Sequence, residues 1–142
     1  MRLGRQGKAS SKSSKSTKTK ARGRDDFLAS TIQKLRDMAG NVCSFPECSV
    51  HTHGAKASFD GPFSVGVACH IKAASAGGPR YDADQSIESR RDVSNGIWMC
   101  QTHSKLIDAD ESPYSAETLL QWKRLAELRA NRMVNKRAFT EQ

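Results

Sequence analysis

Two pairs of metal-binding side chains constrain the fold of this chain more than any other feature. Four residues separate Cys43 from Cys48, and two separate Cys100 from His103. Two chelating turns of this kind supply the four sulfur and nitrogen ligands that tetrahedral zinc requires. Ordinary buried cysteines or a disulfide are the alternatives, and an intracellular setting argues against the disulfide. The spacing therefore predicts one structural zinc ion that joins two distant segments of the chain.

Two further histidines, His51 and His53, lie close to the first cysteine pair, so either could replace one of its ligands. We interpret both as loop histidines. Because four protein ligands leave no open coordination position, we expect the zinc to stabilise the fold rather than to take part in chemistry.

Positive charge is concentrated at the N-terminus. Residues 1–24 hold nine of the 23 Lys and Arg residues and no acidic residue, which leaves 14 basic against 15 acidic residues elsewhere. This segment has almost no apolar residues, so we predict a disordered basic tail. Such a tail would bind the phosphates of DNA without reading its sequence. A tail that only improves solubility is the alternative.

The same N-terminal segment also bears on location. No apolar run follows its charges, as a secretory signal would require, and it lacks the amphipathic pattern of an organellar transit peptide. No segment is long and apolar enough to span a membrane. We therefore expect a soluble cytoplasmic protein without membrane contact, of unknown oligomeric state.

The remaining residues predict a mixed α+β domain. Asp25 or Asp26 can cap a helix that runs to about Met38, and Gly40 suits its C-terminal stop. The apolar face of this helix is formed by Leu28, Ile32 and Leu35. Residues 51–62 are polar and rich in glycine, so we predict a loop there.

Two short strands are predicted at residues 63–70 and 96–100 from their apolar and β-branched content. Residues 73–94 between them lack periodicity, and a structureless connector of this length in a compact domain usually has a functional reason. A short helix is expected to begin near Thr102, and Ser115 can cap a long final helix. The apolar positions of these two helices are Leu106, Ile107, Leu119, Trp122, Leu125 and Ala126.

The string GVACHIKAASAGGPRYD, followed by SNGIWMCQTHSKLID, resembles the HNH endonuclease superfamily. The resemblance covers about residues 41–128. It includes the first cysteine pair, the His after an apolar strand, the GGPR connector, the Asn before the second strand, the second zinc turn and the closing LID. It implies a small zinc-braced ββα-metal core with flanking helices. The implied divisions are a tail over 1–24, a helix over 25–40, the core over 41–112, and a C-terminal helix and tail over 113–142.

The activity that the resemblance implies is metal-dependent hydrolysis of phosphodiester bonds, which nicks or cuts DNA. His70 would be the general base that activates water, and Asn95 would hold its imidazole. A divalent ion, Mg²⁺ or Mn²⁺ with Ni²⁺ or Zn²⁺ as alternatives, would stabilise the charge that builds on the phosphate. Histidine suits proton transfer near neutral pH. Taken alone, a satisfied core histidine at position 70 and a turn residue at position 95 are the ordinary alternatives.

The expected ligands of this catalytic metal depart from the family pattern. Active members carry a second His after the second zinc turn, where this chain has Ser104. The residue before the general base, often Asp or His, is Cys69, for which a small buried residue is the alternative. Asp108 keeps a carboxylate one helical turn beyond Ser104. Asp108 is thus the first candidate ligand, ahead of Ser104 and Cys69.

Arginine and lysine residues near the motif are expected to contact phosphate. They are Arg80 in the GGPR connector, Arg90 and Lys72, with a structural ion pair as the alternative for Arg90. The final helix adds basic faces with Lys123, Arg124, Arg129, Arg132, Lys136 and Arg137. A DNA nuclease is the first functional hypothesis. A catalytically weakened zinc-containing HNH scaffold that binds DNA is the second, and a protein-interaction domain is the third.

Overall fold

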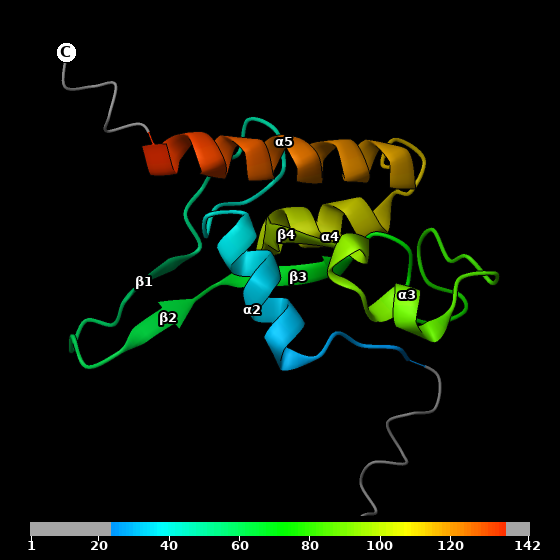
Figure 1. Ribbon diagram of the computed structural model, residues 1–142, viewed down its shortest axis with the longest axis horizontal. Coiled ribbons are helices and arrows are strands. Elements are labelled where there is room, and N and C mark those ends of the chain that lie inside the picture. The colour runs from blue at the N-terminus through cyan, green and yellow to red at the C-terminus, as the bar shows by residue number, and fades with distance from the viewer. Residues whose placement is uncertain (1–23, 136–142) are drawn as a thin grey trace, which may run out of the picture.

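A computed structural model describes residues 24–135 (Figure 1). Its elements are α2 (Ala29–Met38), β1 (His53–Ala55), β2 (Pro62–Ser64), β3 (Gly66–His70), α3 (Ile87–Arg91), the 3₁₀ turn η1 (Val93–Asn95), β4 (Gly96–Cys100), α4 (Gln101–Ala109) and α5 (Ala116–Asn135). The fold is therefore mixed α+β, as predicted. The predicted tail over 1–24 lies outside the described residues except for Arg24, and Lys136 and Arg137 of the predicted final helix also lie outside them.

The centre of the fold is an antiparallel pair of strands, β3 and β4, in which His70 lies opposite Gly96 and Gly66 lies opposite Cys100. Helix α4 follows β4 directly and packs against both strands. A Cβ atom at Gly66 would come within 2.1 Å of the Trp98 ring, so this position needs glycine for the strand to lie against the indole. The pairing sets His70 and Cys100 at opposite ends of the strands.

Both faces of β4 are buried, since its side chains alternate between two core clusters. The larger cluster lies on the side of α4 and α5 and consists of Cys43, Cys69, Ile71, Ile97, Met99, Ile107 and Leu119. The smaller lies on the side of α2 and consists of Phe27, Leu35, Ala39 and Trp98. Figure 1 shows α2 and α5 on either side of the strand pair. The central strands are thus held from both faces.

The N-terminal helix begins later than predicted. Leu28, not Asp25 or Asp26, is the N-cap residue, and it makes no side-chain capping bond. Leu28 and Ile32 are 60% and 38% exposed, so only Leu35 of the predicted apolar face is buried. The helix ends at Met38 with Ala39 as its C-cap, and Gly40 follows with a positive φ of 67°, as suits the predicted stop.

The first predicted strand is interrupted at Val65. Residues Pro62–Ser64 pair with His53–Ala55 in a separate hairpin, so the segment predicted as a loop contains a strand. The Val65 N–H donates to the Thr52 carbonyl at 2.8 Å, which ties this hairpin to the chain ahead of it. A three-residue strand is too short to give a readable alternation of apolar side chains.

The connector over 73–94 is also more ordered than predicted. Ser86 caps α3 by accepting from the Ser89 N–H, and Asp92 caps η1 by accepting from the Ser94 N–H. Neither element is long enough to show helical periodicity in the sequence. The caps satisfy backbone groups that would otherwise lack partners in these short turns.

The last two helices follow the prediction closely. Helix α4 begins at Gln101 and buries Ile107, while Leu106 remains exposed. The Ser115 hydroxyl accepts from the Thr118 N–H at 3.2 Å at the start of α5. In that helix Leu119 and Ala126 are buried and Leu125 is exposed, so the stripe is narrower than predicted.

Candidate functional site

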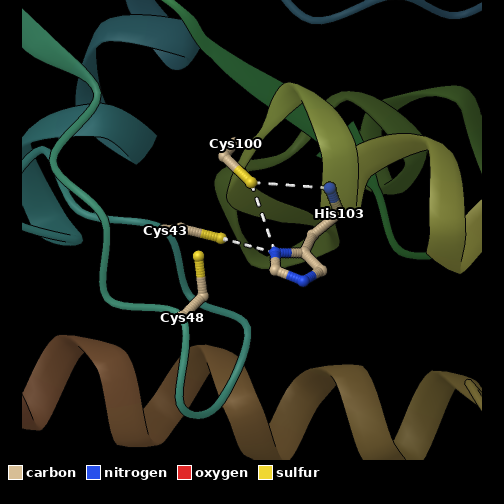
Figure 2. Close-up of side chains that lie close together, drawn as sticks. All are labelled: Cys43, Cys48, Cys100 and His103. Atoms are coloured by element: carbon tan, nitrogen blue, oxygen red, sulfur yellow. Dashed lines mark hydrogen bonds between the residues drawn. The ribbon is translucent and has the colours of Figure 1, made fainter.

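Four side chains from the two predicted turns converge on one point (Figure 2). The ligand atoms of Cys43, Cys48, Cys100 and His103 all lie within 4.8 Å of one another. His103 Nδ1 is 3.8 Å from Cys43 Sγ and 3.2 Å from Cys100 Sγ. Tetrahedral zinc, with Zn–S near 2.3 Å and Zn–N near 2.0 Å, sets its ligand atoms about 3.5 to 3.8 Å apart. The donor set and its spacing therefore fit a metal ion such as zinc.

All four cysteines of the chain are free thiols, as predicted. His51 and His53 do not belong to this cluster. The four members of the cluster are therefore the Cys/Cys and Cys/His pairs predicted from their spacing, without either loop histidine.

Backbone N–H groups donate hydrogen bonds to two sulfur atoms of this cluster. Cys100 is the N-cap of α4 and accepts from the His103 N–H at 3.5 Å, and Cys43 accepts from the Phe45 N–H at 3.5 Å. The bond from Phe45 favours the thiolate form of Cys43. Burial nevertheless raises the pKa of the Cys43 thiol to about 12. At neutral pH a metal ion is what would displace this proton.

An aromatic shell encloses the cluster. Phe45, between the first two cysteines, stacks on the His103 ring with centroids 3.8 Å apart and an interplanar angle of 7°. Trp122 of α5 meets Phe45 edge-on at 4.9 Å. Arg129 of the same helix donates to the Cys43 carbonyl at 3.2 Å. Helix α5 thus fixes the orientation of the ligands, and an apolar shell of this kind limits the access of water.

A cleft of about 500 Å³ lies between β3, the connector and α4. It is lined by His70, Cys69, Ser104 and Asp108, which are the predicted general base and the three predicted ligands of a catalytic metal. Their positions in the sequence span about forty residues, so the fold brings them together. Asn95, Arg80, Arg90 and Lys72 do not line the cleft.

His70 is held in one orientation. Its Nε2 atom is 3.0 Å from the Asp25 carbonyl oxygen. Because a carbonyl only accepts, Nε2 carries the proton and Nδ1 keeps its lone pair. Phe27 stacks on the ring at 3.9 Å with an interplanar angle of 8°. Burial lowers the pKa of His70 below its ordinary value, although the bond to Asp25 acts in the opposite direction. The imidazole is therefore neutral at neutral pH.

Asn95 does not contact the His70 ring, contrary to prediction. Its Oδ1 accepts from the Lys72 N–H at 3.0 Å, and its Nδ2 donates to the Lys72 and Arg90 carbonyls, each at 3.0 Å. Its own carbonyl accepts from the Ile71 N–H at 2.8 Å. Asn95 therefore fixes the backbone just after His70, because a buried amide must find partners for its polar atoms.

Arg80 is not free to contact phosphate, contrary to prediction. Its side chain is only 6% exposed and forms an ion pair of 2.8 Å with Asp108. It also donates to the Ile71 carbonyl at 2.6 Å and to the Ile107 carbonyl at 2.8 Å. A guanidinium can satisfy several acceptors at once, and here it ties the residues after β3 to the end of α4. The ion pair uses Oδ1 of Asp108, and within residues 24–135 no partner is seen for its Oδ2 atom.

The other two predicted phosphate contacts differ in exposure. Arg90, with a side chain only 10% exposed, pairs with Asp25 at 3.0 Å. It also donates to the Tyr81 hydroxyl at 3.2 Å and the Asp82 carbonyl at 3.0 Å, so the structural alternative for Arg90 is the correct one. Lys72 pairs with Asp82 at 3.0 Å but is partly exposed. Its contact with nucleic acid remains a prediction.

The predicted ligands of the catalytic metal offer few donor atoms. Burial, and then the charge of Asp108, raises the pKa of the Cys69 thiol far above its ordinary value, which disfavours the thiolate. The Ser104 hydroxyl donates to the Gln101 carbonyl at 2.8 Å. Among the described residues, the one group of three or more His, Cys, Asp and Glu side chains with metal-binding geometry is the Cys3His cluster. The cleft fits only an ion held by Asp108 together with water and substrate oxygens.

Several residues of the cleft were not predicted from the sequence. Arg24 and Lys105 line it and add positive charge, while Asp25 and Phe27 hold His70 from outside it. Arg24 had a signal, as the last basic residue of the N-terminal segment. No sequence signal pointed to Phe27, because nothing in the sequence indicates that the residues ahead of α2 pack against the end of β3.

No protein-family model matches the chain, and no curated protein matches it either. None of the helices formed by residues 24–135 has the length and apolar character needed to cross a lipid bilayer.

Proposed function

We propose that this protein is an HNH-type nuclease that hydrolyses phosphodiester bonds in DNA with His70 as general base. The observation that carries the proposal is that a neutral His70, with an unprotonated Nδ1, lines the same cleft as the Asp108 carboxylate. A base and an acidic metal-ligand candidate in one cleft are what metal-assisted hydrolysis requires. The strand–strand–helix order of β3, β4 and α4 beside a Cys3His cluster also agrees with the resemblance.

The residues of the cleft have separate roles in this proposal. Nδ1 of His70 accepts a proton from the water that attacks phosphorus. The positive imidazole that results is stabilised by its Nε2–H bond to the Asp25 carbonyl. Oδ2 of Asp108 and the phosphate oxygens would hold a divalent ion, which stabilises negative charge on the phosphate and leaving oxygen. Arg24 and Lys105, which also line the cleft, would contact neighbouring phosphates.

The charge of the chain supports a polyanionic substrate. The net charge is +8, and residues 1–23 contain eight Lys or Arg and no acidic residue. This segment joins the described chain at Arg24, which lines the cleft. Phosphate binding by the segment would therefore bring the backbone of DNA to His70. The Cys3His cluster would hold a structural zinc and take no part in the reaction.

DNA binding without cleavage is the second candidate function. Two observations favour it: Arg80 already occupies one oxygen of Asp108, and the Ser104 hydroxyl is bonded to its own helix. A cleft with one remaining carboxylate oxygen would bind a catalytic metal weakly. The protein would then grip phosphate through its basic residues and leave the backbone intact.

A nicking assay separates the two functions. Zinc-loaded protein is incubated with supercoiled plasmid and Mg²⁺, Mn²⁺, Ni²⁺ or Zn²⁺, beside His70→Ala and a matched His51→Ala control. His51 is exposed and belongs to neither site. We expect metal-dependent nicking that is lost in His70→Ala and kept in His51→Ala. Salt-sensitive retardation of DNA in a gel, with no nicking by any metal, would refute the nuclease and support the binding module.

A further inference from the structure

We propose that residues 25–27, ahead of α2, form a positioning strap that fixes the tautomer and ring plane of His70. The inference rests on the proposed role of His70 as a base. The Asp25 carbonyl accepts from Nε2 at 3.0 Å, which leaves Nδ1 as the basic atom. The Phe27 ring stacks on the imidazole at 3.9 Å. The hydrogen bond to the Asp25 carbonyl fixes which ring nitrogen carries the proton and where it points. The stack on Phe27 fixes the plane of the imidazole ring.

The strap is anchored independently of His70. The Asp25 N–H donates to the Ala74 carbonyl at 3.0 Å, and the Asp25 carboxylate pairs with Arg90 at 3.0 Å. Both side chains of this ion pair are largely buried, so bulk water screens it little. Phe27 is buried in the cluster with Leu35 and Trp98. The strap is therefore a fixed support rather than a loose segment that touches the histidine.

The opposite strand leaves room for this arrangement. Gly96 lies opposite His70, and a Cβ atom there would come within 2.9 Å of Phe27 and 2.4 Å of Leu35. A side chain at position 96 would therefore force both Leu35 and the Phe27 ring to shift. A glycine at this point of β4 thus serves the stack on His70 as well as the strand itself.

The strap also explains the contacts of Asn95. The Asn95 amide donates to the Arg90 carbonyl at 3.0 Å, and the Arg90 guanidinium holds Asp25. Asn95 therefore acts on His70 through Arg90 and Asp25, without touching the ring. Asp25, Phe27 and Arg90 are positioning residues in this scheme, because none of them meets the substrate.

Phe27→Leu tests the strap, because leucine keeps an apolar side chain at this buried site and removes the stack. Leu35→Val is the matched control, since Leu35 belongs to the same buried cluster as Phe27 and has no ring to stack on His70. Two measurements are made on zinc-loaded full-length protein: the nicking kinetics, and the ¹⁵N shifts of the His70 ring. The spectrum of His70→Ala identifies the His70 signals among the four histidines.

In the wild type we expect a single His70 tautomer with the proton on Nε2. In Phe27→Leu the ring is free to turn away from the Asp25 carbonyl, so we expect shifts averaged over two tautomers. We also expect a kcat about tenfold lower, with KM changed less than about twofold. Leu35→Val should show neither change at a comparable loss of thermal stability. Wild-type shifts and kcat in Phe27→Leu, or a wild-type proton on Nδ1, would overturn the inference. Wild-type protein that cuts nothing would refute the nuclease instead, and the spectra alone would then decide whether the strap holds the ring.

Discussion

Arg80 and Asp108 form an ion pair of 2.8 Å in which the arginine is buried and the aspartate is about half exposed. The pair joins the residues after β3 to the end of α4, and so it sets the distance between the two walls of the cleft. It also takes one oxygen from the carboxylate on which the proposed catalysis depends. Asp108 would thus serve two purposes: one oxygen pairs with Arg80 to stabilise the fold, and the other would bind the proposed catalytic metal.

Replacement of Arg80 tests how much its bonds contribute to the stability of the fold. Arg80→Ala would leave the Ile71 and Ile107 carbonyls without their charged donor, and we expect it to lower the free energy of unfolding by about 3 kcal/mol. Asp108→Asn removes only the more exposed partner and should cost about 1 kcal/mol or less. Urea denaturation of both variants measures the difference. Equal losses would mean that the ion pair, rather than the carbonyl bonds, is the main contribution of Arg80.

Removal of the metal should unfold the domain. The cluster joins the segment after α2 to the start of α4, and burial of free thiols and an unliganded imidazole does not replace four metal bonds. Elemental analysis should find about one zinc per chain. Cys43→Ser should lose both the zinc and the cooperative thermal transition, whereas Cys69→Ser should keep the zinc. Metal-free protein with an unchanged melting curve would disprove a structural role for the ion.

Cys69 provides a separate test of the cleft. Its thiol is buried and its pKa is raised by burial and by the charge of Asp108, so it should not bind the catalytic metal. We expect Cys69→Ala to keep nicking activity within about twofold of the wild type, with a loss of stability of about 1 kcal/mol for the small cavity. A loss of activity above tenfold in zinc-loaded, folded Cys69→Ala would show that the sulfur is a ligand after all.

In the proposed reaction, the dependence of nicking on pH follows from the protonation of His70. Burial lowers its pKa below the ordinary value of 6.5, and the base acts only when it is unprotonated. The rate should therefore be constant above about pH 7 and should fall as pH drops through the lowered pKa. The same shift makes the unfolded chain bind more protons than the folded one below pH 6.5, so His70 also reduces stability as pH falls.

A pH–rate profile with zinc content measured at each point checks this expectation, because acid also releases zinc from thiolates. Half-maximal activity above pH 6.5, with zinc retained, would contradict a base whose pKa is lowered by burial.

Deletion of residues 1–23 should weaken DNA binding and leave the domain folded. Eight basic residues are removed, so the dependence of log K on log salt should become shallower by several units. Gel retardation across a salt series measures this slope. Substitution of the same eight residues by glutamine controls for length. An unchanged slope in both variants would mean that the tail serves solubility alone.

Local patterns predicted the metal cluster and the elements next to it. The Cys and His spacing identified all four members of the cluster, and the apolar run ending at Cys100 gave the bounds of β4. The Ser115 cap was predicted because its partner, Thr118, lies three residues away. Each of these features depends on residues close together in the sequence, or on the preference of zinc for Cys and His ligands.

Features that depend on distant contacts could not be predicted. Asp25 and His70 lie 45 positions apart in the sequence, and nothing in the composition of either segment indicates that they meet. Arg80 and Arg90 resembled phosphate contacts because charge is visible in a sequence whereas burial is not. Only the packing of the connector against α4 and the strap shows that their guanidiniums are used inside the protein.

The attachment of the basic N-terminal segment at Arg24 has a consequence for how the protein would search DNA. A tethered cationic chain keeps the cleft at a high effective concentration near any duplex that it has already bound. If the protein cuts DNA as proposed, the domain could release one nicked product and engage a nearby bond before the whole protein dissociates. Nicks on a single plasmid should therefore cluster in low salt. They should become independent of one another as salt weakens the binding of the basic segment to the phosphates of DNA.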